Sequence, residues 1–210
     1  MIKGVALVQE GLRELGYDPG PIDGLHGPRT SAAYKAGMAA FAPTATKDAG
    51  EPPWITEGMK TLGWHEVNDK AKLAAWLKSG GKALGDPAKL PWCGDWAETT
   101  VAKTLPNEKL PENPFFAQNW ATFGVPTPPV RWCFGVIRWS PSSGHVCNIL
   151  GQHGANYVVL GGNQRDRVSI AEFPKSAFIA FRMPATYPAL PNILPNITAD
   201  DLITSIAATR

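Results

Sequence analysis

The pattern of apolar and polar residues predicts a small helical segment at the start of the chain. Residues 5–15 carry apolar side chains at roughly helical spacing, and Gly16 ends this pattern. A second helix is expected from near Pro28 to about Phe41, because proline suits the first turn of a helix. Residues 17–30, between the two helices, are rich in Gly, Pro and Asp and predict a compact turn.

The rest of the chain changes from helical to strand-like patterns. Helical spacing occurs at 54–63, at 69–79, from Pro91 to about Lys103, and in a short segment around 115–123. Apolar stretches then predict strands at 131–139, 145–151, 156–161, 167–171 and 177–183. Helices followed by antiparallel strands are typical of the α+β class.

These patterns divide the chain into four parts. We expect a small helical module at 1–42, a linker at 43–53, an α+β domain at 54–184, and a Pro-rich tail with a short helix at 185–210. The first module has few apolar side chains to bury. We therefore expect residues 1–41 to pack against the larger domain instead of moving freely on the linker.

Composition and charge exclude several classes of protein. The 210 residues carry a net charge of +2, and the Lys and Arg residues are scattered, which is not typical of a nucleic-acid-binding protein. Residues 1–10 lack the apolar run of a signal peptide, and no stretch approaches the length of a membrane span. We expect a monomer made in a cytoplasm that binds no nucleic acid and inserts into no membrane.

Three polar residues suggest a cysteine-based catalytic site. Cys93 begins a Pro-led helix, whose N-terminus stabilises a thiolate, and His145 opens an apolar strand further along. Asn163 follows the next strand, where its side-chain carbonyl could hold the ring N–H of the histidine. The order Cys, His, Asn matches nucleophile, base and orienting residue.

The neighbouring polar residues allow other interpretations. Three cysteines form no disulfide framework, and Cys133 and Cys147 lie in apolar stretches where burial is expected. A metal site of Cys93, His145 and Cys147 stays a minor alternative, but no Cys-x-x-Cys pair supports it, so we expect no metal and no cofactor. Asp95 is interpreted as a first-turn helix charge, and Glu98 as part of a solvated face.

Several motifs between about 52 and 183 resemble one family of enzymes. They are Pro52-Pro53-Trp54, Pro91-Trp92-Cys93-Gly94-Asp95, Gly144-His145-Val146, Leu160-Gly161-Gly162-Asn163-Gln164 and Val168-Ser169-Ile170. Together they resemble the papain-like cell-wall cysteine peptidases and amidases of the CHAP and NlpC type, and most of all a phage and prophage branch of them. The segment Arg131-Trp132-Cys133-Phe134 departs from the Pro-Gly-Asp turn expected before the strand.

This resemblance implies a papain-like domain, with the cysteine at a helix N-terminus packed on a small antiparallel sheet. It makes Cys93 the nucleophile, His145 the general base and then acid, and Asn163 the orienting residue. Trp92 is a candidate for lining the substrate groove. Gln164 is a candidate for contacting the substrate as an oxyanion donor.

The first segment resembles the N-terminal half of the small helical peptidoglycan-binding domain. The matching features are Val8-Gln9, Gly16-Tyr17, Asp23-Gly24 and Gly27-Pro28-Arg29-Thr30, while Gly37-Met38 replaces the family's Phe-Gln and no third helix follows. The resemblance makes Tyr17, Asp23 and Arg29 candidate wall-binding residues. The same Asp-Gly and Gly-Pro pairs also build turns in proteins that bind nothing.

The function implied is that of an endolysin-like peptidoglycan hydrolase. Such an enzyme would cut an amide bond in the peptide stem, or the lactyl-alanine amide, through a cysteine thioester. Its partner would be bacterial peptidoglycan, reached from the host cytoplasm after release or as part of a virion. Two alternatives stay open: an inactive wall-binding or virion structural protein, and an acyltransferase that uses the same three residues.

Overall fold

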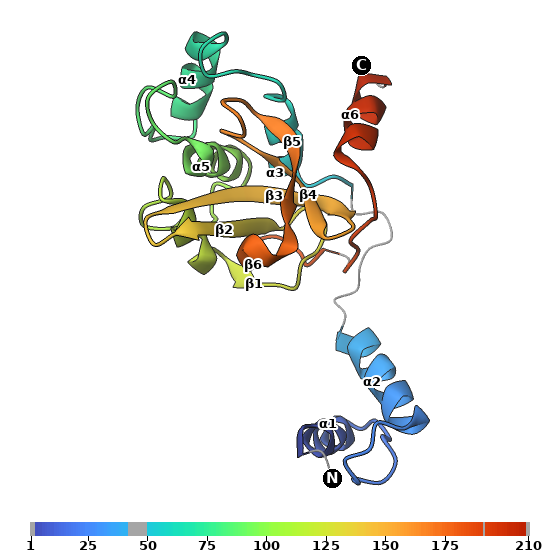
Figure 1. The fold of residues 1–210 in the computed structure, drawn as a ribbon. Coiled ribbons are helices and arrows are strands. Elements are labelled where there is room, and N and C mark those ends of the chain that lie inside the picture. The colour runs from blue at the N-terminus through green and yellow to red at the C-terminus, as the bar shows by residue number, and fades with distance from the viewer. Residues whose placement is uncertain (1–2, 42–49, 191, 209–210) are drawn as a thin grey trace. The chain divides into compact units, whose positions relative to one another are not determined.

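The computed structural model describes residues 3–41, 50–190 and 192–208, and the chain separates into two compact units (Figure 1). The first unit is Met1–Thr46 and the second is Lys47–Arg210. The second unit combines helices with a single antiparallel sheet. The α+β class predicted from the pattern is therefore confirmed at this level.

The first unit consists of two helices joined by a turn whose centre is a buried glutamine. The helices are α1 (Lys3–Glu14) and α2 (Pro28–Phe41). Gln9, only 1% exposed, donates through Nε2 to Asp23 Oδ1 at 3.0 Å and to Thr30 Oγ1 at 3.1 Å. Its Oε1 accepts the backbone N–H of Gly24 at 2.9 Å. One side chain thus connects α1, the turn and the start of α2.

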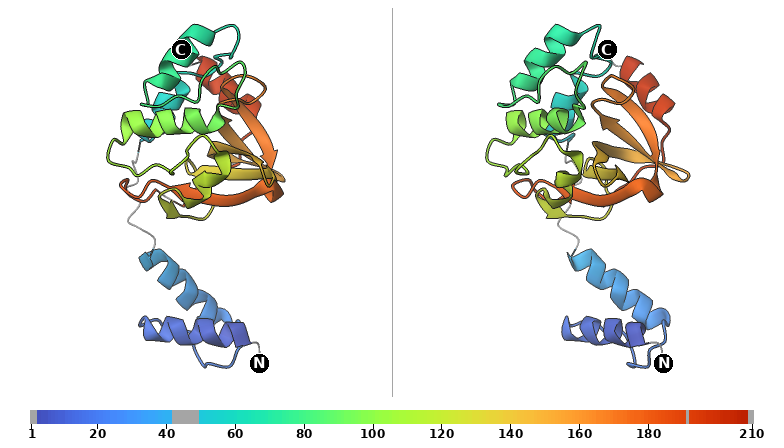
Figure 2. Two further views of the ribbon diagram at one scale, coloured as in Figure 1. Left: turned by 90° about the vertical axis from the view of Figure 1, so that its left-hand side faces the viewer. Right: turned by 60° about the vertical axis from the view of Figure 1, so that its left-hand side comes forward.

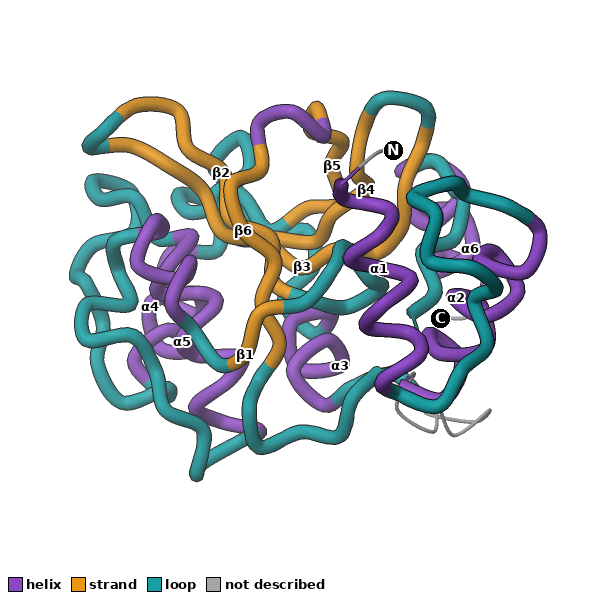
Figure 3. The backbone as a smooth tube through the Cα atoms, turned by 90° about the horizontal axis from the view of Figure 1, so that it is seen from below, coloured by secondary structure: helices purple, strands orange, loops and turns teal. Residues whose placement is uncertain are grey.

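The helices of the second unit are short. They are α3 (Pro53–Met59), α4 (Lys70–Lys78), α5 (Cys93–Thr104) and α6 (Ala199–Ala208), with two 3₁₀ helices, η1 (Ala117–Thr122) and η2 (Lys175–Ala177). Figure 3 shows α4 and α5 side by side. The helical patterns predicted at 54–63, 69–79 and 91–103 correspond to α3, α4 and α5.

The sheet has six strands in the order β1-β6-β2-β3-β4-β5, with all neighbours antiparallel. Their bounds are β1 (Val125–Pro126), β2 (Phe134–Ser140), β3 (Ser143–His153), β4 (Asn156–Gly161), β5 (Ser169–Pro174) and β6 (Phe178–Met183). Strands β2 to β5 form a meander, and β6 returns to the free edge of β2. The five predicted strands are all present, and the pattern missed the two-residue β1.

An aromatic core joins the helices to one face of the sheet. Trp120 stacks on Phe134 with ring centroids 5.2 Å apart, and Trp54 stacks on Phe134 at 6.2 Å. Trp96 is fully buried, and its indole N–H donates to Thr61 Oγ1 at 3.0 Å. Figure 2 shows α3, α4 and α5 gathered on one side of the strands. This packing holds α5 against β3, which brings the predicted nucleophile and base to neighbouring elements.

The C-terminal segment packs on the second unit. The backbone N–H of Gln152 in β3 donates to Pro195 at 2.8 Å, and that of Ile197 returns a bond to Gln152 at 2.9 Å. Leu190 and Leu202 are buried in the same core as the sheet. The predicted tail at 185–210 therefore forms part of this unit over its described residues.

Candidate active site

Cys93 is the first residue of α5, and its side chain is 5% exposed. No side chain caps this helix start, so its first-turn N–H groups are left for another acceptor. Burial raises the pKa of the Cys93 thiol, while the backbone N–H groups of Val146 and Gly94 act in the opposite direction. The thiol lies beside the residue that follows His145, and it needs a base to become a thiolate.

The start of α5 is held tightly by the segment that precedes η1. A Cβ atom on Gly94 would overlap the carbonyl oxygen of Pro114 and lie 2.8 Å from that of Phe115. Only a residue without a side chain fits this contact. The position of Cys93 is therefore fixed by the packing of the Pro114 and Phe115 backbone on the adjacent Gly94.

His145 lies near the start of β3, opposite Ile137 of β2, and is 6% exposed. Its ring packs against Phe173, with centroids 5.5 Å apart. Nε2 lies 3.1 Å from Oε1 of Gln164. Burial lowers the pKa of His145 to about 4, although the bond to Gln164 acts in the opposite direction. The ring is therefore neutral near pH 7.

The amide of Gln164 determines which ring nitrogen carries the proton. Its Nε2 donates to the Ser169 carbonyl oxygen at 2.5 Å and to Ser169 Oγ at 3.2 Å. Because a carbonyl oxygen only accepts, the amide nitrogen faces Ser169 and the amide oxygen faces His145. The His145 Nε2 must then carry the hydrogen, which leaves Nδ1 as a hydrogen-bond acceptor.

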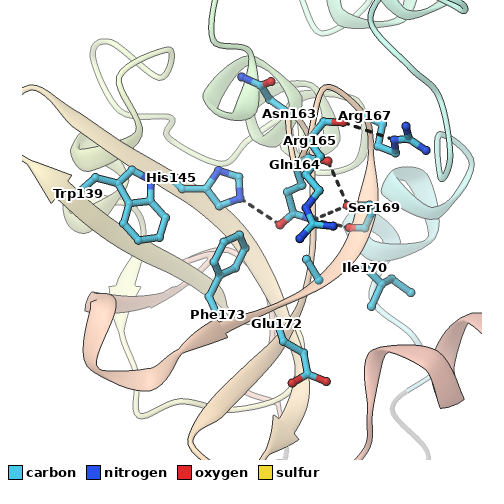
Figure 4. Close-up of a pocket in the computed structure, with 11 residues that line it drawn as sticks. Trp139, His145, Asn163, Gln164, Arg165, Arg167, Ser169, Ile170, Glu172 and Phe173 are labelled. Carbon is cyan, nitrogen blue, oxygen red and sulfur yellow. Dashed lines mark hydrogen bonds between the residues drawn. The ribbon is translucent and has the colours of Figure 1, made fainter.

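The side chain that bonds to the His145 ring is Gln164, and not Asn163 as expected. Figure 4 shows the Asn163 side chain pointing away from the His145 ring, and no hydrogen bond of this side chain occurs within the described chain. Asn163 has a φ of 57°, in the left-handed region, so the chain turns sharply after β4 and presents the next residue to the ring. The sequence suggests Gln164 only as an oxyanion donor, because the left-handed turn that brings its amide to the ring cannot be read from the residue order.

A pocket of about 780 Å³ opens beside His145. His145, Asn163 and Gln164 line it together with Trp139, Phe173, Arg165 and Arg167. In Figure 4, Trp139 lies on one side of His145 and the two arginines on the other. Cys93 is not among the lining residues, so the pocket reaches the histidine while the thiol stays covered.

Trp92, expected to line a substrate groove, is instead part of the core. Its side chain is 1% exposed, and its indole N–H donates to Glu66 Oε2 at 2.9 Å. A Cβ atom on Gly162 would lie 2.7 Å from the Trp92 ring. Trp92 therefore supports the loop behind the pocket and does not line it.

The candidate wall-binding residues of the first unit make contacts within the turn between α1 and α2. Asp23 accepts from Gln9 and from the backbone N–H of Leu25 at 2.9 Å. Arg29 pairs with Asp18 at the surface, and Tyr17 is half-buried. These contacts show that the residues of the motif stabilise the turn. Binding of the cell wall by this unit stays a prediction.

Two carboxylates of α5, expected at the surface, are buried. Asp95 is 1% exposed and accepts the backbone N–H of Leu84 at 2.9 Å, and Glu98 is 4% exposed. Burial raises the pKa of Asp95 to about 6. Burial and the nearby Asp95 raise the pKa of Glu98 to about 7. The expectation of solvated charges is wrong here because α3, α4 and the loop before α5 cover this helix.

The remaining cysteines are buried, as predicted. Cys133 and Cys147 are fully inaccessible, and burial raises the pKa of Cys133 to about 12. Within the described ranges, no group of three His, Cys, Asp or Glu residues is arranged to hold a metal ion. The alternative of a metal site at Cys93, His145 and Cys147 therefore has no support from the geometry.

No family model, curated protein or solved structure matches this chain. Among the described helices, none combines the length and apolar character needed to cross a membrane.

Proposed function

We propose that the chain is a papain-like cysteine peptidase or amidase that hydrolyses peptidoglycan. The observation that carries this proposal is the buried His145, bonded to Gln164 at the wall of a pocket and followed by Val146, whose N–H faces the Cys93 thiol. The cell-wall substrate rests on the sequence motifs around these residues and on the resemblance of the first unit to a wall-binding module.

In the proposed reaction, His145 Nδ1 accepts the Cys93 proton as the sulfur attacks the amide carbon of the substrate. Burial disfavours both the thiolate and the imidazolium. Proton transfer is therefore coupled to attack instead of preceding it. The imidazolium then gives its proton to the leaving amine, which produces a thioester. Water attacks the thioester with His145 as base, and this step releases the acid and restores the thiol.

The negative charge of the tetrahedral intermediate also needs donors. The N–H groups at the uncapped start of α5 are suited to this role, because they belong to a helix N-terminus beside the sulfur. Gln164 is not available as a donor, since its amide is committed to His145 and Ser169. This assigns the oxyanion to the backbone of the helix and changes the expected role of Gln164.

The proposal is tested by replacing Cys93 and His145 separately with Ala and measuring release of fragments from purified sacculi. Each change should reduce the rate by about 1,000-fold or more, because the two residues act as one unit. Cys133→Ala is the matched control, since it removes another buried thiol. Circular dichroism verifies that each variant is folded. Activity within about tenfold of wild type in Cys93→Ala contradicts a cysteine mechanism.

Mass spectrometry of the released fragments identifies the bond. A free muramyl lactate with a complete stem indicates the amidase, and a shortened stem indicates an endopeptidase. Transfer of the acyl group to an added amine in preference to water would indicate the acyltransferase.

A second candidate is an inactive wall-binding protein on the same fold. It is favoured by one observation: the Cys93 thiol is almost fully covered and the pocket does not reach it. Retention of the chain on sacculi without any release of fragments would support this candidate over the hydrolase.

A further inference from the structure

We infer that Arg165 and Arg167 form a carboxylate-recognition subsite in the pocket beside His145. Both arginines line the pocket, and both are exposed. The subsite would select stem peptides with a free carboxylate near the bond that is cut. This inference rests on the proposed function and specifies its substrate.

Neither arginine forms an ion pair with a described carboxylate. Arg167 Nε donates to the carbonyl oxygen of Arg165, at 3.4 Å. Two neighbouring cations on one rim repel each other, so an anion bound between them would lower the electrostatic energy.

The single acid that lines the pocket does not neutralise them. Glu172 accepts from Asn156 Nδ2 at 3.2 Å, from His153 Nδ1 at 3.2 Å and from the backbone N–H of Ala199 at 3.3 Å. Figure 4 shows its carboxylate directed away from His145. Its charge is therefore committed to other partners, which leaves Arg165 and Arg167 as the charged side chains of the pocket wall beside Gln164. Asp166, between them in the chain, is exposed and does not line the pocket.

The loop that carries the arginines is held in an unusual conformation. Arg165 and Asp166 have φ values of 54° and 64°, in the left-handed region where residues other than glycine are uncommon. The backbone N–H of Gln164 donates to the carbonyl oxygen of Arg167 at 2.9 Å, and that of Glu66 donates to Asp166 at 2.9 Å. Such strained backbone is concentrated at ligand sites, where the surrounding contacts maintain it.

The chemistry of the rim fits a carboxylate. A guanidinium group presents a planar set of donors that binds a carboxylate through two parallel hydrogen bonds. The stem of peptidoglycan carries carboxylates at its acidic residues and at its free end. With the arginines on one side of His145 and Trp139 on the other, a bound stem could contact both while its amide lies at the histidine.

The test measures binding with the full chain carrying Cys93→Ala, so that no cleavage interferes. The probes are a synthetic stem tetrapeptide with free carboxylates and the same peptide with those carboxylates amidated. Calorimetry should give about 10- to 100-fold tighter binding of the free acid, the range expected for charge-assisted hydrogen bonds. Adding Arg165→Gln and Arg167→Gln should remove this preference, and the two Arg→Lys changes should restore part of it.

The control is the pair Lys78→Gln and Lys109→Gln, which removes the same charge from exposed positions outside the pocket. It should keep the full preference. Equal binding of the two probes by the parent, absence of binding at millimolar concentration, or an unchanged preference in the arginine variant would overturn the subsite. Hydrolysis of sacculi by the chain with native Cys93 is scored separately. Hydrolysis of sacculi with equal binding of the two probes would contradict only the subsite. Discrimination between the probes without hydrolysis would contradict only the proposed hydrolase function.

Discussion

At the scale of single residues, the site depends on which side chain turns toward the histidine. The Cys and His positions were accessible from the sequence, because each lies beside a recognisable element boundary. The partner of the ring was not, since its identity depends on a left-handed turn at Asn163 that shifts the next residue into place. Both amides line the pocket, but Gln164 bonds to the ring and Asn163, one position earlier, does not.

This assignment predicts different effects for the two amides. Gln164→Ala should lower turnover by about 100-fold, because the ring loses the acceptor that fixes its tautomer. Asn163→Ala should leave turnover within about threefold of wild type, since its side chain makes no bond to the ring. Steady-state hydrolysis of soluble muropeptides provides the measurement, and the reverse order of effects would restore Asn163 as the orienting residue.

The buried carboxylate of Glu98 predicts a pH dependence of stability. Its pKa is raised from 4.5 to about 7, so the folded protein keeps a proton that the unfolded chain releases. The contribution of protonated Glu98 to the free energy of unfolding is therefore fully present below about pH 4.5, and it is lost as the pH rises through about 7. Glu98→Gln removes this loss.

The difference in free energy of unfolding between Glu98→Gln and wild type should therefore shift in favour of the variant by about 2–3 kcal/mol from pH 4 to pH 8. Urea denaturation at the two pH values measures the gain. Glu112→Gln, at an exposed position, is the control and should show no such change. A difference from wild type that is the same at both pH values would show that Glu98 ionises normally in the folded protein.

At the scale of elements, the periodicity of the chain predicts where the strands lie, but it does not predict which side of α5 is buried. Strands β2 to β6 were predicted because their apolar runs are long and bounded by turn residues. Helix α5 buries nine residues in succession, Cys93 to Val101, so no polar face marks its orientation. The sequence pattern therefore predicts surface charges at Asp95 and Glu98, and the structure buries both.

The tight contact at the start of α5 predicts a specific sensitivity. Gly94→Ala should destabilise the protein by about 1–3 kcal/mol, because the new methyl group overlaps the backbone at Pro114. The same change at Gly11, within α1, meets nothing within 4 Å and should be neutral or mildly stabilising. Thermal melting compares the two. Equal melting temperatures for both variants would mean that the segment at Pro114 moves aside easily.

At the scale of the whole molecule, the chain consists of two units with unequal cores. The second unit contains a large aromatic and aliphatic core, whereas the buried apolar side chains described in the first are Leu12 and Ala33. The first unit relies on polar contacts around Gln9 instead. The division into a small and a large part was predictable from composition, but the central role of Gln9 depends on the folded turn.

Removal of residues 1–46 should therefore separate two properties. Binding to sacculi should fall, because the turn that resembles a wall-binding module lies in the first unit. Hydrolysis of soluble muropeptides should stay within about threefold of the full chain, because every candidate catalytic residue lies in the second unit. Unchanged sacculus binding would remove the wall-binding role from the first unit.

The position of Trp139 gives the molecule a built-in optical reporter. All eight tryptophans lie in the described part of the chain, and Trp139 alone has an exposed side chain, at 51%. It also lines the pocket beside His145 and lies 5.8 Å from Phe173. A soluble quencher such as acrylamide should therefore reach this indole ahead of the others, and a ligand in the pocket should shield it. Occupancy can thus be followed by intrinsic fluorescence, without any label and without turnover.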